Sequence, residues 1–405
     1  MVGECCLHID ILRPYTHRTR FRYRYHSVEE RLHKQMPLTF VHASDFHLGA
    51  DLRRFGDAAG WLSSAQYAAL DKTLCSARDR RADFVLICGD LFDSRRPSRS
   101  VLDRTRLIFA AYPSVSVYVI PGTHDFLSEK SVFALSQPDW APPNVTILTE
   151  NSSSPFPLAD KNAQLYFRAN RSNKSHQSPI AQMQRIKEDG FHIGLAHGSL
   201  QTGSLAFEYE SPIGIKTIEA SGLDYLALGH WHRPRADKFG RTTLAYSGIP
   251  QPISYSDPED GSIYVVTIED TGQVEIDRIV TSTIALKRIS ATIYHPQEAA
   301  NLLEELADPN SVVKLAFLFS DNWIEASEVE EVIEKAKARF LLVQSDMPNG
   351  LDRVRPPAPP NGPNEQLLRV FTAELDRLRE ADSPERAVIY EKAIEHGIKI
   401  ITGEL

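Results

Sequence analysis

Carboxylates and histidines recur in five short motifs that extend over residues 45–232. The first three motifs supply mainly aspartates, and the last two supply histidines. In chain order the motifs are Asp45-Phe46-His47, Gly89-Asp90-Leu91-Phe92-Asp93, Gly122-Thr123-His124-Asp125, Ala196-His197-Gly198 and Gly229-His230-Trp231-His232. A mixture of carboxylate and imidazole ligands suits Mn²⁺, Fe²⁺ and Zn²⁺. The set therefore predicts a metal centre.

Phosphoester hydrolysis is the chemistry that such a centre could perform. Two divalent cations roughly 4 Å apart can activate a water and bind the non-bridging phosphate oxygens. A carboxylate suits the ligand that bridges the two ions, and Asp90, in a Gly-Asp turn after an apolar run, is expected to be that bridge. Asp45 and His47 are two residues apart, as are His230 and His232. Residues i and i+2 at an extended strand end point the same way, so each pair is expected to chelate.

Short apolar runs precede all five motifs and predict the elements that position them. Strands are expected at residues 38–43, 83–88 and 115–120, and helices at 66–80 and 101–111. Further strands are expected at 145–148, 165–168, 191–196, 225–228, 243–246, 262–268 and 274–280. Continuous Val, Ile and Leu runs indicate strands covered on both faces. The expected fold class is α/β, a two-sheet β core flanked by helices, with ligands at the carboxyl ends of strands.

Composition divides the chain into five segments. Residues 1–35 contain a basic and aromatic stretch and predict a disordered extension, with a basic arm for nucleic acid as the alternative. Residues 36–284 carry the motifs and form the expected catalytic domain. Residues 285–346 alternate strand and helix patterns and predict a small α/β cap domain. A proline-rich linker at 347–366 leads to a helical segment at 367–405, which either folds back or docks on a partner.

The chain has 405 residues and a formal net charge of −8. A protein that grips DNA alone usually presents a broad basic surface, so DNA contact is expected from a local patch or a second protein. Arg95, Arg96 and Arg99 could steer a phosphate backbone, or they could simply cover a solvated loop. No run reaches eighteen apolar residues, so no membrane span is expected. Four cysteines without a CxxC pair favour a reducing cytoplasm.

The ordered motif set resembles the calcineurin-like metallophosphoesterase family, in which DxH, GDxxx, GNHD, a lone histidine and GHxH follow one another. The strings at residues 40–49, 89–93, 197–200, 225–232 and 246–252 are similar to the SbcD-type DNA repair exonucleases, including the YhaO-like branch. This resemblance covers residues 37–280 and, more weakly, the cap. It implies a DNA exonuclease or endonuclease that hydrolyses phosphodiesters with a metal-activated water. It also implies an SMC-like, SbcC-type coiled-coil ATPase partner and a role in DNA repair.

The resemblance implies two divalent ions, with Mn²⁺ preferred and Fe²⁺, Zn²⁺ or Mg²⁺ as alternatives. One ion would be held by Asp45, His47, Asp90 and His232, and the other by Asp90, His197, His230 and residue 123. The family has asparagine at that last position, whereas this chain has Thr123, whose hydroxyl is a weaker and shorter ligand. His124 would protonate the leaving oxygen, and Asp125 would orient His124. Asp93 is expected either to support a metal ligand by a hydrogen bond or to stabilise the turn.

Other functions stay open, because a fold does not fix its substrate. The same metal core could serve a phosphodiesterase or phosphatase that acts on a small molecule. The threonine at position 123 also allows a scaffold subunit with a weakened metal site. A homodimer is compatible with the sequence, and no membrane association is expected.

Overall fold

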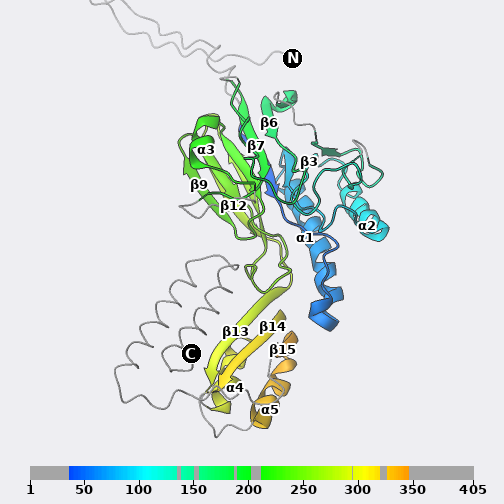
Figure 1. Ribbon diagram of the computed structural model, residues 1–405, viewed down its shortest axis with the longest axis vertical. Coiled ribbons are helices and arrows are strands. Elements are labelled where there is room, and N and C mark those ends of the chain that lie inside the picture. The colour runs from blue at the N-terminus through cyan, green and yellow to red at the C-terminus, as the bar shows by residue number, and fades with distance from the viewer. Residues whose placement is uncertain are drawn as a thin grey trace, which may run out of the picture. The chain divides into compact units, whose positions relative to one another are not determined.

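The computed structural model describes residues 36–134, 138–149, 155–186, 189–201, 211–293, 295–319 and 326–345. The predictions for residues 1–35, for the linker at 347–366 and for the segment at 367–405 lie outside these residues. The described chain forms two six-stranded sheets and a three-stranded sheet (Figure 1).

The first sheet carries the first three motifs. Its strands are, in spatial order, β12 (Val274–Val280), β11 (Ser262–Ile268), β1 (Leu38–Ala43), β2 (Phe84–Cys88), β3 (Val117–Ile120) and β4 (Val145–Ile147). Strands β1 to β4 run parallel, and β11 and β12 complete the sheet in antiparallel pairings. Asp45, Asp90 and residues 122–125 therefore leave the sheet at the same edge, where the carboxyl ends of parallel strands meet.

The second sheet carries the last two motifs. In spatial order its strands are β5 (Phe156–Leu158), β6 (Ala163–Phe167), β7 (Phe191–His197), β8 (Tyr225–Gly229), β10 (Thr242–Tyr246) and β9 (Arg235–Phe239). Strands β6, β7, β8 and β10 are parallel, with β5 and β9 antiparallel at the edges. His197 ends β7 and His230 directly follows β8, so both lie at the carboxyl edge of this sheet.

Side chains that alternate along the central strands create the layers of the fold. In β1, Phe40 contributes to the core between the two sheets, whereas Val41 contributes to the core on the opposite face. In β8, Tyr225 faces the same central core, and Leu226 faces the other side of its sheet. This period of two is that of a strand. The two sheets therefore pack face to face, which confirms the expected two-sheet α/β core.

Helices cover the outer face of each sheet. Helices α1 (Ala59–Asp79) and α2 (Arg99–Ala110) pack on the first sheet, and α3 (Ile215–Ser221) packs on the second (Figure 1). Helix α1 begins seven residues before the predicted start at residue 66. Its first turns are stabilised by a tertiary contact, because Leu62 is buried in a cluster with Leu286 of the third sheet.

The third sheet has a core of its own. Its elements are β13 (Ala285–Ile293), α4 (Pro296–Glu305), β14 (Asp308–Phe319), α5 (Ala326–Lys337) and β15 (Phe340–Ser345). The strands pair in parallel in the order β13-β14-β15. This order of elements is the one expected for residues 285–346.

Polar contacts join the third sheet to the residues around the first motif. The amide of Gln344 in β15 donates to the backbone oxygen of Arg54 at 2.9 Å. Its amide oxygen accepts the Tyr255 hydroxyl at 2.7 Å. Arg54 lies in the 3₁₀ helix η2 (Arg53–Ala58), which closely follows the Asp45 loop. The third sheet is thus tied to the segment that follows the first ligands.

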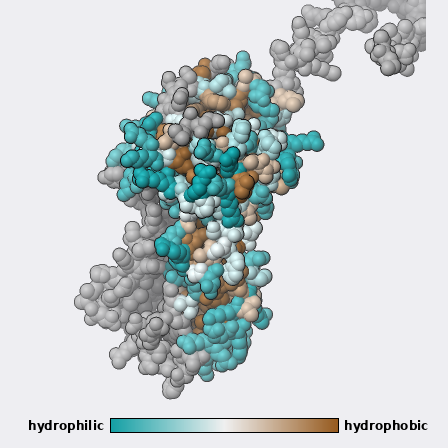
Figure 2. All heavy atoms as spheres, turned by 90° about the vertical axis from the view of Figure 1, so that its right-hand side faces the viewer, coloured by the Kyte–Doolittle hydropathy of each residue, from teal (hydrophilic) through white to brown (hydrophobic). Residues whose placement is uncertain are grey.

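The surface of the described chain is mainly hydrophilic on the face shown in Figure 2, where hydrophobic residues occur in separate groups. The large exposed hydrophobic residues of the described ranges are Met36, Trp61, Leu107, Ile186, Ile215 and Val280. They belong to six different parts of the chain. Within the described ranges, no helix combines the length and apolarity that a membrane span needs.

Candidate metal centre

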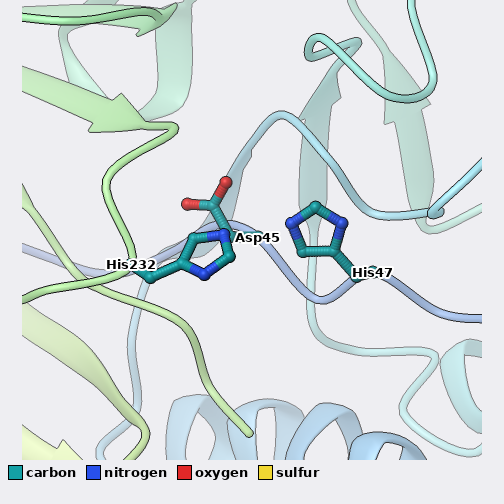
Figure 3. A group of neighbouring side chains, drawn as sticks. All are labelled: Asp45, His47 and His232. Carbon is teal, nitrogen blue, oxygen red and sulfur yellow. The ribbon is translucent and has the colours of Figure 1, made fainter. Parts of the chain in front are cut away.

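The structure brings the predicted ligands together from loops that are far apart in the sequence. Ligand atoms of Asp45, His47 and His232 all lie within 4.8 Å of one another (Figure 3). Asp45, Asp90 and His197 form a second group by the same measure. Because Asp45 belongs to both groups, they form one continuous cluster at the carboxyl edges of the two sheets.

His230 lies beside this cluster without belonging to either group. Its ring centroid is 5.2 Å from that of His197. Its backbone N–H donates to both carboxylate oxygens of Asp45 at 3.1 Å. The backbone of His230 therefore fixes the Asp45 carboxylate, and the role of its imidazole as a ligand stays a prediction.

Four residues of the site adopt left-handed backbone angles. The φ values are 57° for Asp45, 47° for His47, 52° for Asp90 and 103° for His230. Such angles are uncommon for residues other than glycine and concentrate at functional sites. The expectation of extended strand ends at the two chelating pairs is therefore wrong. Left-handed turns aim these side chains, and the His47 N–H donates to the Asp90 carbonyl at 3.0 Å to hold two loops together.

Two glycines allow the loops to approach this closely. A Cβ atom on Gly89 would lie 2.3 Å from Nδ1 of His197. A Cβ atom on Gly122 would lie 2.2 Å from Oδ1 of Asp90. Any larger residue at either position would displace a candidate ligand.

Three histidines present the same ring nitrogen to the cluster. Each Nδ1 is paired with an acceptor: His47 with Asp93 Oδ1 at 3.0 Å, His197 with Cys88 O at 2.9 Å, and His232 with Asp257 Oδ1 at 2.7 Å. Such acceptors keep a proton on Nδ1 and direct Nε2 toward the cluster, as in metal-binding histidines. His47 Nε2 is buried and has no hydrogen-bond partner within the described chain. A bound cation would satisfy this atom, so the donor set fits divalent metals.

Asp257 is a residue of the site that the sequence reasoning missed. Its Oδ1 accepts from His232, and its Oδ2 accepts the backbone N–H groups of Ile253 at 2.9 Å and Ser254 at 2.8 Å. Burial would raise the pKa of Asp257, but its hydrogen bond with His232 and the charge on that ring outweigh burial and lower it. The resemblance at residues 246–252 stops just before this turn. No local pattern distinguishes Asp257 from an ordinary turn aspartate.

Thr123 lies inside the cluster and is only 6% exposed. Its hydroxyl donates to Asp90 Oδ2 at 3.1 Å and lies 3.2 Å from His197 Nε2. Burial opposes a charge on Asp90, but His197, and then His47, hold the pKa of its carboxyl well below the usual range. The hydroxyl thus reaches the candidate ligands directly, although threonine is shorter than asparagine.

His124 lies at the rim, with a side chain that is 51% exposed. Its Nδ1 is 3.4 Å from Asp93 Oδ1, and the hydrogen bond with Asp93 raises the pKa of His124 to about 9 against the effect of burial. Asp125 instead accepts the backbone N–H groups of Gly122 at 2.7 Å and Phe92 at 3.0 Å. The structure therefore differs from the expectation that Asp125 orients His124. Asp125 points into the protein and braces the loop, and Asp93 pairs with His124.

The three predicted phosphate-binding arginines lie in different settings. The guanidinium of Arg95 lies 4.5 Å from the centre of the Phe126 ring, two residues after His124. Arg99 is paired with Asp103 at 2.9 Å on the same helix. Arg96 is exposed, and its backbone N–H donates to a serine hydroxyl in the same loop. Of the three, the structure brings Arg95 to the loop of the third motif.

Comparisons with known proteins agree with this site. Residues 38–234 match a family model described as calcineurin-like phosphoesterase. Over 240 residues the chain is 27% identical to the "Uncharacterized metallophosphoesterase YhaO" of Bacillus subtilis, a match that covers 57% of each chain. It is 27% identical over 273 residues to the SbcD subunit of the nuclease SbcCD from the same organism, covering 58% of this chain and 66% of that one.

The SbcD subunit of the nuclease SbcCD from Staphylococcus saprophyticus is 25% identical over 267 residues, with 60% of this chain and 68% of the relative covered. The matches thus span between 57% and 68% of the length of these relatives. The family match includes all five motifs and both groups of candidate ligands around Asp45. Residues 38–234 of this chain form a calcineurin-like metallophosphoesterase domain.

Proposed function

We propose that this chain is a metal-dependent nuclease that hydrolyses phosphodiester bonds of DNA, and that it works with an SMC-like ATPase of the SbcC type. The carrying observation is the set of three histidines whose Nδ1 atoms are anchored and whose Nε2 atoms are left for the cluster. When two divalent ions are bound, they supply an activated water and neutralise phosphate oxygens. Two relatives named as nuclease subunits favour DNA as the substrate.

Two distances support Asp90 as the bridging ligand. Its Oδ2 lies 3.2 Å from His197 Nε2 and 3.9 Å from His47 Nε2. Asp45, His47, Asp90 and His232 would hold one ion, and Asp90, His197, His230 and Thr123 the other. The donors are carboxylate, imidazole and hydroxyl groups, a mixture that suits Mn²⁺ among other divalent ions.

The surroundings of His124 support a role in proton transfer at the rim of the site. Its ring lies 4.7 Å from the ring of His47, while its side chain remains half exposed. Nδ1 of His124 faces the Asp93 carboxylate, which orients the ring. His124 can therefore approach a substrate oxygen outside the cluster and donate a proton to the leaving group. Arg95, held against Phe126, would contact the phosphate backbone beside it.

The test is cleavage of linear duplex and single-stranded DNA by the full chain with Mn²⁺, with and without the ATPase partner. Asp90→Asn and His197→Ala should abolish cleavage, while His295→Asn, at an exposed histidine of the third sheet's unit, should leave it unchanged. DNA left intact under all these conditions would overturn the nuclease assignment. Turnover of bis(p-nitrophenyl) phosphate alone would then favour a small-molecule phosphodiesterase.

Metal analysis of the same samples tests the remaining alternative, a scaffold subunit with a weakened metal site. Fewer than two metal ions per chain, with no increase in Thr123→Asn, would favour that alternative. A cytoplasmic location, a role in DNA repair and a homodimer stay predictions that these assays do not address.

A further inference from the structure

A polar pocket lies against two of the loops that carry candidate metal ligands. It has a volume of about 180 Å³ and is lined by residues within 168–179 together with Ser211. Among the described residues, the lining includes the two arginines Arg168 and Arg171 and no carboxylate side chain. At roughly 30 Å³ per water molecule this space corresponds to about six waters, enough for a phosphate group. We call it the Arg168–Ser211 pocket.

The floor of this pocket is joined to two of the ligand-bearing loops. The backbone N–H of Asn170 donates to the Pro121 carbonyl at 3.3 Å, and its carbonyl accepts the Leu127 N–H at 2.8 Å. These two bonds bracket the third motif. The carbonyl of Ser211 lies 2.2 Å from the position of a Cβ atom on Gly198, which follows the histidine of the fourth motif. The pocket and the metal centre therefore share two supporting loops.

The pocket offers positive charge and hydrogen-bond donors to an anion. Asn170 is 7% exposed and Ser211 is 4% exposed, so both are buried polar residues of the lining. Within the described chain, the Asn170 amide makes one hydrogen bond, a long contact of 3.5 Å to the Ser211 hydroxyl. The Arg168 guanidinium donates to neutral acceptors, among them Gln177 at 2.7 Å. Arg171 is exposed and makes no ion pair with described residues. Charge-assisted hydrogen bonds to phosphate suit such a set.

We propose that the Arg168–Ser211 pocket binds a second phosphate of the polynucleotide strand whose scissile phosphate occupies the metal centre. This inference rests on the proposed function and specifies its substrate class, a chain with at least two phosphates. A phosphomonoester or a single diester would fill only the metal centre. Contacts to phosphate oxygens carry no base sequence information, so the pocket selects polynucleotides without selecting a sequence.

Equilibrium binding tests the pocket independently of hydrolysis. The probe is a fluorescein-labelled oligothymidylate, measured by anisotropy with the full chain in EDTA over a range of salt concentrations. Arg171→Ala should weaken binding about three- to tenfold and reduce the salt slope by about 0.7, as expected for one lost contact to a single strand. Asn170→Asp keeps the side-chain shape and should weaken binding in the same direction, because it places a carboxylate in the pocket.

Arg80→Ala is the matched control. Arg80 is an exposed arginine just before β2, at the edge of the first sheet opposite to the candidate metal ligands. It should leave both the affinity and the salt slope unchanged. An affinity of Arg171→Ala equal to that of the parent chain would overturn the proposal. The proposal would also be overturned if Arg171→Ala weakened only the binding of inorganic phosphate, measured by its competition with the probe, and not the binding of the oligonucleotide itself. The pocket would then be a small-anion site.

Kinetic measurements with Mn²⁺ distinguish a role of Arg171 in the pocket from a role at the metal centre. Arg171→Ala should lower kcat/KM for the oligonucleotide about three- to tenfold and leave kcat/KM for bis(p-nitrophenyl) phosphate unchanged. An equal loss with both substrates would refute the pocket, since Arg171 would then support the fold or the metal centre. No hydrolysis of either substrate by the parent chain would overturn the proposed function, and the binding experiment would still decide the pocket.

Discussion

Asp257 offers a direct test of how the structure prepares His232 to bind a metal. In Asp257→Asn the side chain keeps its size, and the amide oxygen can still accept the N–H groups of Ile253 and Ser254. The amide NH₂ group then faces His232 Nδ1, where a carboxylate oxygen accepts at 2.7 Å in the parent chain. The favoured tautomer becomes the one with the proton on Nε2. That tautomer cannot bind a metal through Nε2.

The magnitude follows from the hydrogen bond that the metal-bound state would lose. Hydrogen bonds to charged groups contribute about 1.5–3 kcal/mol. At about 1.4 kcal/mol per factor of ten, the affinity for the ion at His232 should fall roughly ten- to a hundredfold. Loss of the outer partner of a metal-binding histidine typically has an effect of this size.

Isothermal titration of Mn²⁺ into the metal-stripped chain measures this change. Asp277→Asn is a matched control, because Asp277 is an exposed carboxylate paired with Arg80 and is remote from the cluster. Thermal melting of the metal-free variants checks that the fold is kept. In a His232→Ala background, the Asp257→Asn change should have no further effect on Mn²⁺ affinity.

Two results would refute this reasoning. Parent-like Mn²⁺ affinity in Asp257→Asn would show that the Asp257 hydrogen bond does not control the ligand. A further loss of affinity in the His232→Ala background would show that Asp257 acts through the loop and not through His232.

Three further predictions concern other parts of the described chain. Thr123→Asn replaces a hydroxyl by an amide oxygen and should raise the affinity for the second ion about tenfold; an unchanged affinity by calorimetry would contradict a ligand role for position 123. Burial lowers the pKa of His42 from 6.5 to about 4, so its contribution to stability is complete above pH 6.5 and is lost as the pH falls toward 4. Between about pH 8 and pH 5, the free energy of unfolding measured with urea should fall by about 2 kcal/mol because of this group. An equally steep fall of the unfolding free energy with pH in His42→Gln would refute this cause. Asp224→Asn removes a buried charge held by Arg185 and Arg241 and should cost about 3 kcal/mol in urea unfolding; Mn²⁺ affinity should stay unchanged, and a reduced affinity would show that this network also supports the metal centre.

The central strands could be predicted from the sequence because they are covered on both faces. Largely apolar runs predicted β1 and β11, which lie inside the first sheet, with their observed bounds. The edge strand β12 was also predicted with its observed bounds, because Val274, Ile276 and Ile279 give its half-buried positions an apolar signal. The edge strands β5 and β9 and the short helix α3 were not predicted. Strand β9 alternates half-buried and exposed residues and includes charged side chains, so it depends on pairing with β10 and has no apolar signal of its own.

The candidate ligands could be predicted because their residue types and order are distinctive. Apart from Asp93, which was expected to support a ligand or the turn and is paired with His47, their supports could not be predicted, because these lie in other segments of the chain. His124 is paired with Asp93 and not with its sequence neighbour Asp125, and Asp257 lies 25 residues from the ring that it holds. Residue spacing also suggested straight strand ends, whereas the backbone of Asp45 is left-handed. Hydrogen bonds between loops decide such angles, and they appear only when the fold is complete.

The left-handed turns at the metal centre have a consequence for how this domain can diversify. A substitution at Asp45, His47 or Asp90 changes a candidate ligand and a demanding backbone angle at the same time. An exposed side chain such as Arg171 carries neither constraint. Inherited changes in substrate preference should therefore accumulate around the rim, while the cluster itself stays fixed or is lost altogether.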